Sequence, residues 1–129
     1  MGRIITEVEV TNALDTSKSL GTLALVDTGA TYLTLPSAWK EKLGALEKLE
    51  EVELETATGE IRKGEIYGPV RVKVANFREI FDEVLFIEME ADATGQYEPL
   101  LGYVVLEKIP VAVDMPGHRL VKVRALDLK

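Results

Sequence analysis

Asp27 ends an apolar run and directly precedes a turn, in the stretch "ALVDTGATYLTLP" (residues 24–36). A buried carboxylate without partners is costly, so this side chain must be hydrogen-bonded, protonated or open to a cleft. Thr28 offers a hydroxyl group, and Gly29 permits a tight turn in which main-chain N–H groups can reach the carboxylate. The local chemistry leaves two interpretations open, a turn capped by its own aspartate and a reactive acid.

The composition limits the classes of protein to which the chain can belong. Its 129 residues predict one domain, residues 1–129, and 47% hydrophobic with 29% charged residues is typical of a folded globular chain. The formal charge of -7 disfavours nucleic acid as a partner. Because the chain has no cysteine, it can form neither a disulfide nor a thiolate nucleophile.

Other signals argue against membranes, metals and nucleotides. The start, "MGRIITEVEV", is acidic where a signal peptide needs an apolar centre, and no apolar run approaches the roughly 18 residues of a membrane helix. His118 is the only histidine and follows a Pro-Gly turn, so it is interpreted as a turn residue. We find no glycine-rich phosphate loop and no serine–histidine motif. We therefore expect a soluble cytoplasmic protein without a metal or cofactor.

Most segments read as short strands, because aliphatic and β-branched residues alternate with polar ones between turn signals. The run at 20–26 is nearly all apolar, which predicts a strand buried on both faces. A brief helix is expected at 34–44, with Pro36 in its first turn, Trp39 in the core and Gly44 as its stop. Further strands are predicted at 3–10, 70–75, 83–89, 100–101, 111–113 and 120–123.

A β-hairpin is predicted between residues 50 and 68. Its first strand alternates glutamates with apolar residues, and Thr58 with Gly59 forms a plausible turn. The glutamates, Glu51, Glu53 and Glu55, are interpreted as a solvated face.

Two motifs resemble a known family. Asp-Thr-Gly-Ala after apolar residues resembles the active-site motif of aspartic proteases, in particular the single-domain, retropepsin-like members. "PLLGYVVLEKI" (residues 99–109) is similar to the segment that crosses behind the catalytic loop in that family and leads into a short helix. The resemblance spans residues 4–123, and the helix at 36–44 is more similar to cellular, prokaryotic-type members. It implies an all-β, closed or partly open barrel with one or two short helices.

The resemblance also implies roles for particular residues. Asp27 would activate a water molecule, Thr28 would brace two active-site loops against each other, and the hairpin between the motifs would be the flap that covers a peptide. The supporting residues would be Thr28, Gly29, Ala30, Leu100, Leu101 and Gly102, and the substrate-binding residues would be Thr31, Thr58 and Gly59.

The chemistry of this family needs two carboxylates that share a proton. Asp15-Thr16-Ser17 could be mistaken for a second triplet, but a serine replaces the essential glycine and the stretch is a polar loop, so we interpret it as a simple turn. The second carboxylate must then come from another chain. A homodimer with Asp27 beside its symmetry mate is the economical solution.

The chain departs from the retroviral pattern at two linked positions. Those members usually carry Asp two places after the motif glycine and Arg directly after the second-motif glycine, where this chain has Thr31 and Tyr103. The flap tip is also less rich in glycine, which predicts a stiffer hairpin. We expect a homodimeric aspartic endopeptidase, and the alternative is a non-catalytic retropepsin-like barrel that binds a peptide or protein partner.

Overall fold

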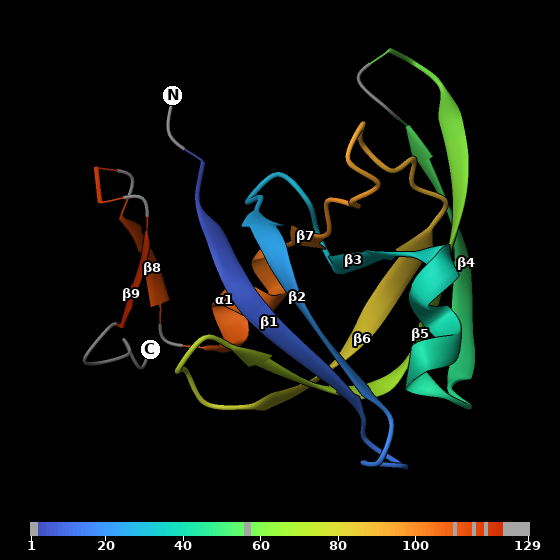
Figure 1. Ribbon diagram of the computed structural model, residues 1–129, viewed down its shortest axis with the longest axis horizontal. Helices are drawn as coiled ribbons and strands as arrows, with labels where there is room; N and C mark the ends of the chain where they lie inside the picture. Colours follow the sequence, from blue (N-terminus) through green and yellow to red (C-terminus); the bar gives the residue numbers. More distant parts are fainter. Residues whose placement is uncertain (1–2, 56–57, 110, 115, 118, 123–129) are drawn as a thin grey trace, which may run out of the picture.

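The computed structural model describes residues 3–55, 58–109, 111–114, 116–117 and 119–122 (Figure 1). Strands dominate, and the two helices of the described part are short. The elements follow in the order β1 (Ile5–Asn12), β2 (Ser19–Val26), β3 (Leu33–Pro36), η1 (Ser37–Leu43), β4 (Glu47–Glu55), β5 (Ile61–Val74), β6 (Ile80–Ile87), β7 (Leu100–Leu101), α1 (Tyr103–Lys108), β8 (Val111–Asp114) and β9 (Arg119–Lys122).

Six strands close into a ring. The sheet runs in the order β1-β2-β7-β3-β6-β5, and β5 returns to pair with β1 in antiparallel register from Val8↔Val74 to Asn12↔Val70. Such closure removes the exposed edges that an open sheet would present. The all-β closed barrel with one or two short helices, predicted from the resemblance, is confirmed for the described residues (Figure 1).

The long strand β5 belongs to two structures at once. Its first half, from Ile61 to Gly68, pairs with β4 to form a hairpin, and its second half, from Val70 to Val74, pairs with β1 in the ring. Strand β6 lies along its other edge over both halves. The second strand of the predicted hairpin and the strand predicted at 70–75 therefore form one continuous strand, β5.

The core lies inside the ring. Alternate residues of β5 point inward, because side chains of a strand alternate between its two faces. Trp39 of η1 is partly buried, packs against this core and meets the ring of Tyr97 edge-on at 5.8 Å. The largest fully buried side chains include Phe86, Leu33, Leu35, Leu43, Ile66 and Leu101.

Two predictions about local structure are wrong. The helix predicted from residue 34 begins at Ser37 and is a 3-10 helix, because Leu33–Pro36 pairs with β6 and, at Thr34, with β7 as the buried strand β3. Gly44 ends the helix as predicted, with a left-handed φ of 67°. Strand β2 is not buried on both faces, since it forms a barrel wall and leaves Leu23 59% exposed on the outer side.

Asn12, at the end of β1, is a buried polar residue that the sequence does not single out. Its Nδ2 donates to the carbonyl oxygens of Leu43 and Ala45, at 2.8 and 2.9 Å. Its Oδ1 accepts from the main-chain N–H groups of Leu14 and Asp15. With these bonds the buried amide is satisfied and joins the β1–β2 turn to the end of η1.

The C-terminal strands pair separately from the barrel sheet. β8 and β9 form an antiparallel two-stranded sheet, which confirms the hairpin predicted there. His118 and Val123 lie outside the described residues. None of the described helices is long and apolar enough to cross a membrane.

Candidate active site

Two motifs far apart in the sequence position the main chain of Asp27. Its N–H donates to the carbonyl oxygen of Leu101 at 3.0 Å, and the N–H of Leu25 donates to the carbonyl oxygen of Pro99 at 2.9 Å. These bonds belong to the parallel pairing of β2 with β7, in which Leu100 lies opposite Leu25. The second motif therefore fixes the end of the strand that delivers the acid.

The turn after β2 orients the carboxylate. The N–H of Gly29 donates to Oδ1 of Asp27 at 2.9 Å, and the N–H of Ala30 donates to the Asp27 carbonyl oxygen at 3.1 Å. A methyl group at Gly29 would lie 3.2 Å from the same Oδ1, so glycine lets the amide approach closely. Asp27 itself is partly exposed. A carboxylate held in this way is oriented by the main chain and still open to a ligand.

The first residues of α1 hydrogen-bond to the end of the Asp27 loop, at Ala30 and Thr31. The N–H of Tyr103 donates to the carbonyl oxygen of Ala30 at 2.9 Å, and the N–H of Val104 donates to that of Thr31 at 3.1 Å. Gly102 makes this contact possible, because a Cβ atom there would lie 2.6 Å from main-chain atoms of the Thr31–Tyr32 segment. Main-chain hydrogen bonds thus join the two segments that carry the Asp–Arg pair in retroviral members.

The structure gathers most of the predicted site residues and leaves two on another element. Thr28 and Thr31 are exposed on the same loop as Asp27. Thr58 and Gly59 lie in the turn between β4 and β5, which projects from one side of the barrel, and Gly59 has a left-handed φ of 83° (Figure 1). The residues gathered around β2 and β7 are Asp27, Gly29, Ala30, Thr31, Leu100, Leu101 and Gly102.

Asp15 forms a self-contained turn, as predicted. Its Oδ1 accepts hydrogen bonds from the hydroxyl group of Ser17 at 2.6 Å and from the Ser17 N–H at 3.2 Å. These bonds hold the pKa of the Asp15 carboxyl below its ordinary value. Its carboxylate is thus engaged by its own turn.

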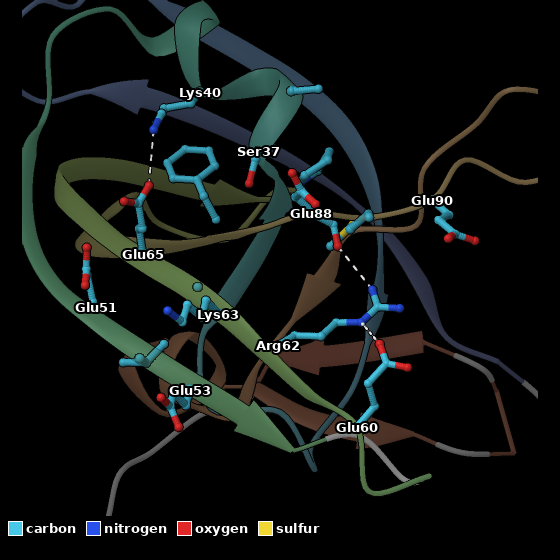
Figure 2. Close-up of a pocket in the computed structure, with 16 residues that line it drawn as sticks. Ser37, Lys40, Glu51, Glu53, Glu60, Arg62, Lys63, Glu65, Glu88 and Glu90 are labelled. Carbon is cyan, nitrogen blue, oxygen red and sulfur yellow. Dashed lines mark hydrogen bonds and ion pairs between the residues drawn. The ribbon is translucent and has the colours of Figure 1, made fainter.

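A groove of about 1230 Å³ lies along the β4–β5 hairpin (Figure 2). Asp27 is not among its lining residues. Sequence reasoning missed the groove because it interpreted the glutamates of β4 as a solvated face. The walls of the groove come from five separate elements. They are Pro36 of β3, the start of η1, both strands of the hairpin, and the end of β6 with the residues after it.

Ion pairs connect Glu65, which lines the groove, to η1 and β4. Glu65 of β5 accepts from Lys48 at 3.0 Å and from Lys40 at 3.3 Å, and these bonds lower its pKa below the ordinary value. Lys40 also donates to the hydroxyl group of Tyr67 at 3.3 Å, which is the main cause of its raised pKa. Lys48 contacts Glu51 as well. Within the described residues, no group of three or more acidic or histidine side chains could hold a metal ion.

Comparison with known proteins agrees with this geometry. A family model described as aspartyl protease matches residues 15–105. Among solved structures, EIAV protease complexed with the inhibitor HBY-793 is similar over 82% of this chain and 86% of that chain, with a TM-score of 0.59 and 22% identity. A search among curated proteins found no significant match. With the greater part of its length matched by the family model, the chain belongs to the aspartyl protease family and has the retropepsin-like fold.

Proposed function

We propose that this protein is an aspartic endopeptidase that cleaves peptide bonds as a homodimer, with Asp27 of each chain forming the catalytic pair. The observation that carries the proposal is the Asp27 carboxylate, held by the Gly29 N–H on a strand end that Leu101 fixes, and still partly exposed. A self-capped surface turn would not need the second motif behind it.

The chemistry follows from bringing two such carboxylates together. Two close carboxylates cannot both ionise comfortably, so they share one proton. The ionised group takes a proton from water, whose oxygen attacks the peptide carbonyl carbon while the protonated group donates to the carbonyl oxygen. When the resulting tetrahedral intermediate collapses, the C–N bond breaks and the leaving nitrogen takes up a proton. The products are a carboxylic acid and an amine.

A twofold dimer supplies the second carboxylate. The described chain offers one Asp-Thr-Gly loop, and Asp15 is engaged by Ser17 in its own turn. Thr28 is exposed next to the acid, where it would be free to brace the partner's loop. A symmetric dimer brings identical residues together at its axis, so Asp27 would meet its own copy there.

The substrate would be an extended peptide beneath the β4–β5 hairpin. An extended main chain can hydrogen-bond to strand edges, and a closing hairpin excludes water from the reaction. Thr31, Thr58 and Gly59 would contact this peptide. We propose one domain over residues 1–129 and a cytoplasmic location, since a chain without cysteine uses no disulfide of an oxidising compartment.

One observation favours a second candidate function. Thr31 and Tyr103 replace the Asp and Arg usual in retroviral members, and main-chain hydrogen bonds join their segments. A barrel that has no catalytic activity could keep the Asp27 loop as a stabilising turn and bind a peptide or protein partner without cleaving it.

A cleavage assay separates the two candidates. The protein and its Asp27→Asn variant are each incubated with a peptide library between about pH 4 and pH 7, the range in which a proton-sharing carboxylate pair is expected to work. Mass spectrometry then identifies products. We expect cleavage by the parent alone, and sedimentation of the parent as a dimer. Binding without cleavage by both proteins would support the non-catalytic barrel, and a strict monomer at high concentration would rule out the mechanism.

A further inference from the structure

The groove along the hairpin carries an excess of negative charge. Six glutamates line it against three cationic residues. Two of these cations are already engaged, Lys40 with Glu65 and Arg62 with Glu60, each at 3.3 Å. Figure 2 shows both pairs, together with the hydrogen bond from Arg62 to the carbonyl oxygen of Glu88. The lining residues are Pro36, Ser37, Ala38, Lys40, Glu51, Val52, Glu53, Glu60, Arg62, Lys63, Gly64, Glu65, Phe86, Glu88, Met89 and Glu90.

Three carboxylates of the groove have no ion pair among the residues that the structure describes. Glu88 and Glu90 follow the end of β6, and Glu53 lies on β4 opposite Lys63 in the strand register. These carboxylates are carried by two walls of the groove, β4 and the segment after β6, so a basic segment lying along the groove would meet negative charge on both. Arginine and lysine suit such a site, because their charged ends pair with carboxylates.

The groove also has an open strand edge. β4 is the last strand of the sheet and, in the described residues, pairs with β5 alone. Glu51, Val52 and Glu53 of this strand line the groove. An extended peptide can add to such an edge through main-chain hydrogen bonds. Val52 lines the groove and is partly exposed, so it offers an apolar contact to the long stems of lysine or arginine side chains.

The dimensions fit a peptide better than a small molecule. The volume of about 1230 Å³ exceeds the roughly 1,000 Å³ at the upper end of small-ligand pockets. The nine residues of β4 extend over about 30 Å at the usual rise of a strand. A chain with a formal charge of -7 also attracts cationic segments over a longer range.

From these observations we infer that the groove is a docking site for a lysine- or arginine-rich extended segment of the protein substrate, distinct from the residues around Asp27. Calling this segment part of a substrate rests on the proposed function, whereas the binding itself does not depend on cleavage. Such a site would select substrates by a basic segment outside the bond that is cut.

Binding is measured on the full-length Asp27→Asn protein, so that cleavage does not interfere. The probe is a fluorescent decapeptide of alternating lysine and threonine, followed by fluorescence anisotropy at low and high salt. Replacing Glu53, Glu88 and Glu90 together by Gln should weaken binding about tenfold, because each exposed pair contributes modestly. High salt should weaken binding of the probe to the Asp27→Asn protein more than to the protein that also carries the three Gln substitutions. Amide NMR shifts of the parent should move mainly in β4 and β5.

A matched control separates local contacts from net charge. The variant Glu7→Gln, Glu9→Gln and Glu107→Gln removes the same charge at exposed residues outside the groove, and it should bind the probe like the parent. Equal weakening in both triple variants would overturn the inference, as would unchanged affinity in the groove variant. If the groove glutamates only keep this strand edge from pairing with other copies, their removal would cause aggregation and leave the affinity unchanged. Cleavage of uncharged peptides by the parent tests the proposed function separately.

Discussion

The main-chain N–H of Asp27 lies 3.0 Å from the carbonyl oxygen of Leu101, its hydrogen-bond acceptor. The position of the acid therefore depends on a segment close to the other end of the chain, and not only on its own turn. Changes at that distant segment should disturb the acid even though they do not touch its side chain.

Gly102→Ala tests this dependence. The added methyl group would lie 2.6 Å from main-chain atoms of the Thr31–Tyr32 segment, so the loop has to move. We expect a loss of about 3 kcal/mol in the free energy of unfolding, measured by urea denaturation, and loss of cleavage with it. Gly21→Ala is the matched control, because its Cβ would meet nothing within 4 Å and its stability should hold. Unchanged stability of Gly102→Ala would show that the close approach is not needed.

Mixing the parent with the Asp27→Asn protein tests the shared dyad. If both carboxylates are required, mixed dimers are inactive, and activity should fall with the square of the parent fraction. An equal mixture at constant total concentration would then keep about a quarter of the activity, because identical subunits pair at random. The measurement is the initial rate of peptide cleavage across a series of ratios. A linear decrease would mean that one aspartate per active unit suffices.

Asn12→Ala should destabilise the barrel by about 3 kcal/mol, since it removes the amide that bonds the buried Leu43 carbonyl oxygen and the partly buried Ala45 carbonyl oxygen and Leu14 N–H. The control is Asn76→Ala, an exposed position where the change should stay within about 0.5 kcal/mol. Both are measured by thermal and urea unfolding. Equal stability of the two variants would contradict the role of Asn12 as a link between the β1–β2 turn and η1.

Glu65 should give the fold an acid-sensitive contact. Hydrogen bonds from Lys48 and then Lys40 lower its pKa in the folded state, so its stabilisation is present above the ordinary pKa and is lost as the pH falls through the folded value. The urea midpoint of the parent should therefore fall more between neutral and acidic pH than that of Glu65→Gln. Glu9→Gln, at an exposed site outside this network, should behave like the parent. If the parent and Glu65→Gln had the same dependence of the urea midpoint on pH, the ion pairs of Glu65 would not be a source of acid sensitivity.

Local patterns in the sequence predicted most of the fold. The alternation along β1, β4 and β5 and the turn at Gly59 are local signals, and the structure follows them. Strand β3 was missed because four residues carry little periodicity. Its identity is set by pairing with β6 and β7, which are distant in the sequence. The exposure of Leu23 was missed for a similar reason, since an apolar run does not show which side of a wall faces the core.

The candidate site was predictable only where a motif marked it. The Asp27 loop and the segment around Gly102 each carry a short pattern, and the structure brings them into contact. Asn12 and the groove carry no such pattern, because their properties come from which elements surround them. An asparagine after a strand reads as a turn residue until the end of η1 and the segment after it supply the carbonyl oxygens of Leu43 and Ala45.

The division of β5 between hairpin and ring has a practical consequence. Since β1 and β6 hold the second half of this strand, residues added at the tip near Gly59 would lengthen the projecting arm and leave every barrel pairing in place. The tip is thus the natural insertion point for a fluorophore or an affinity tag that reports on movements of the arm.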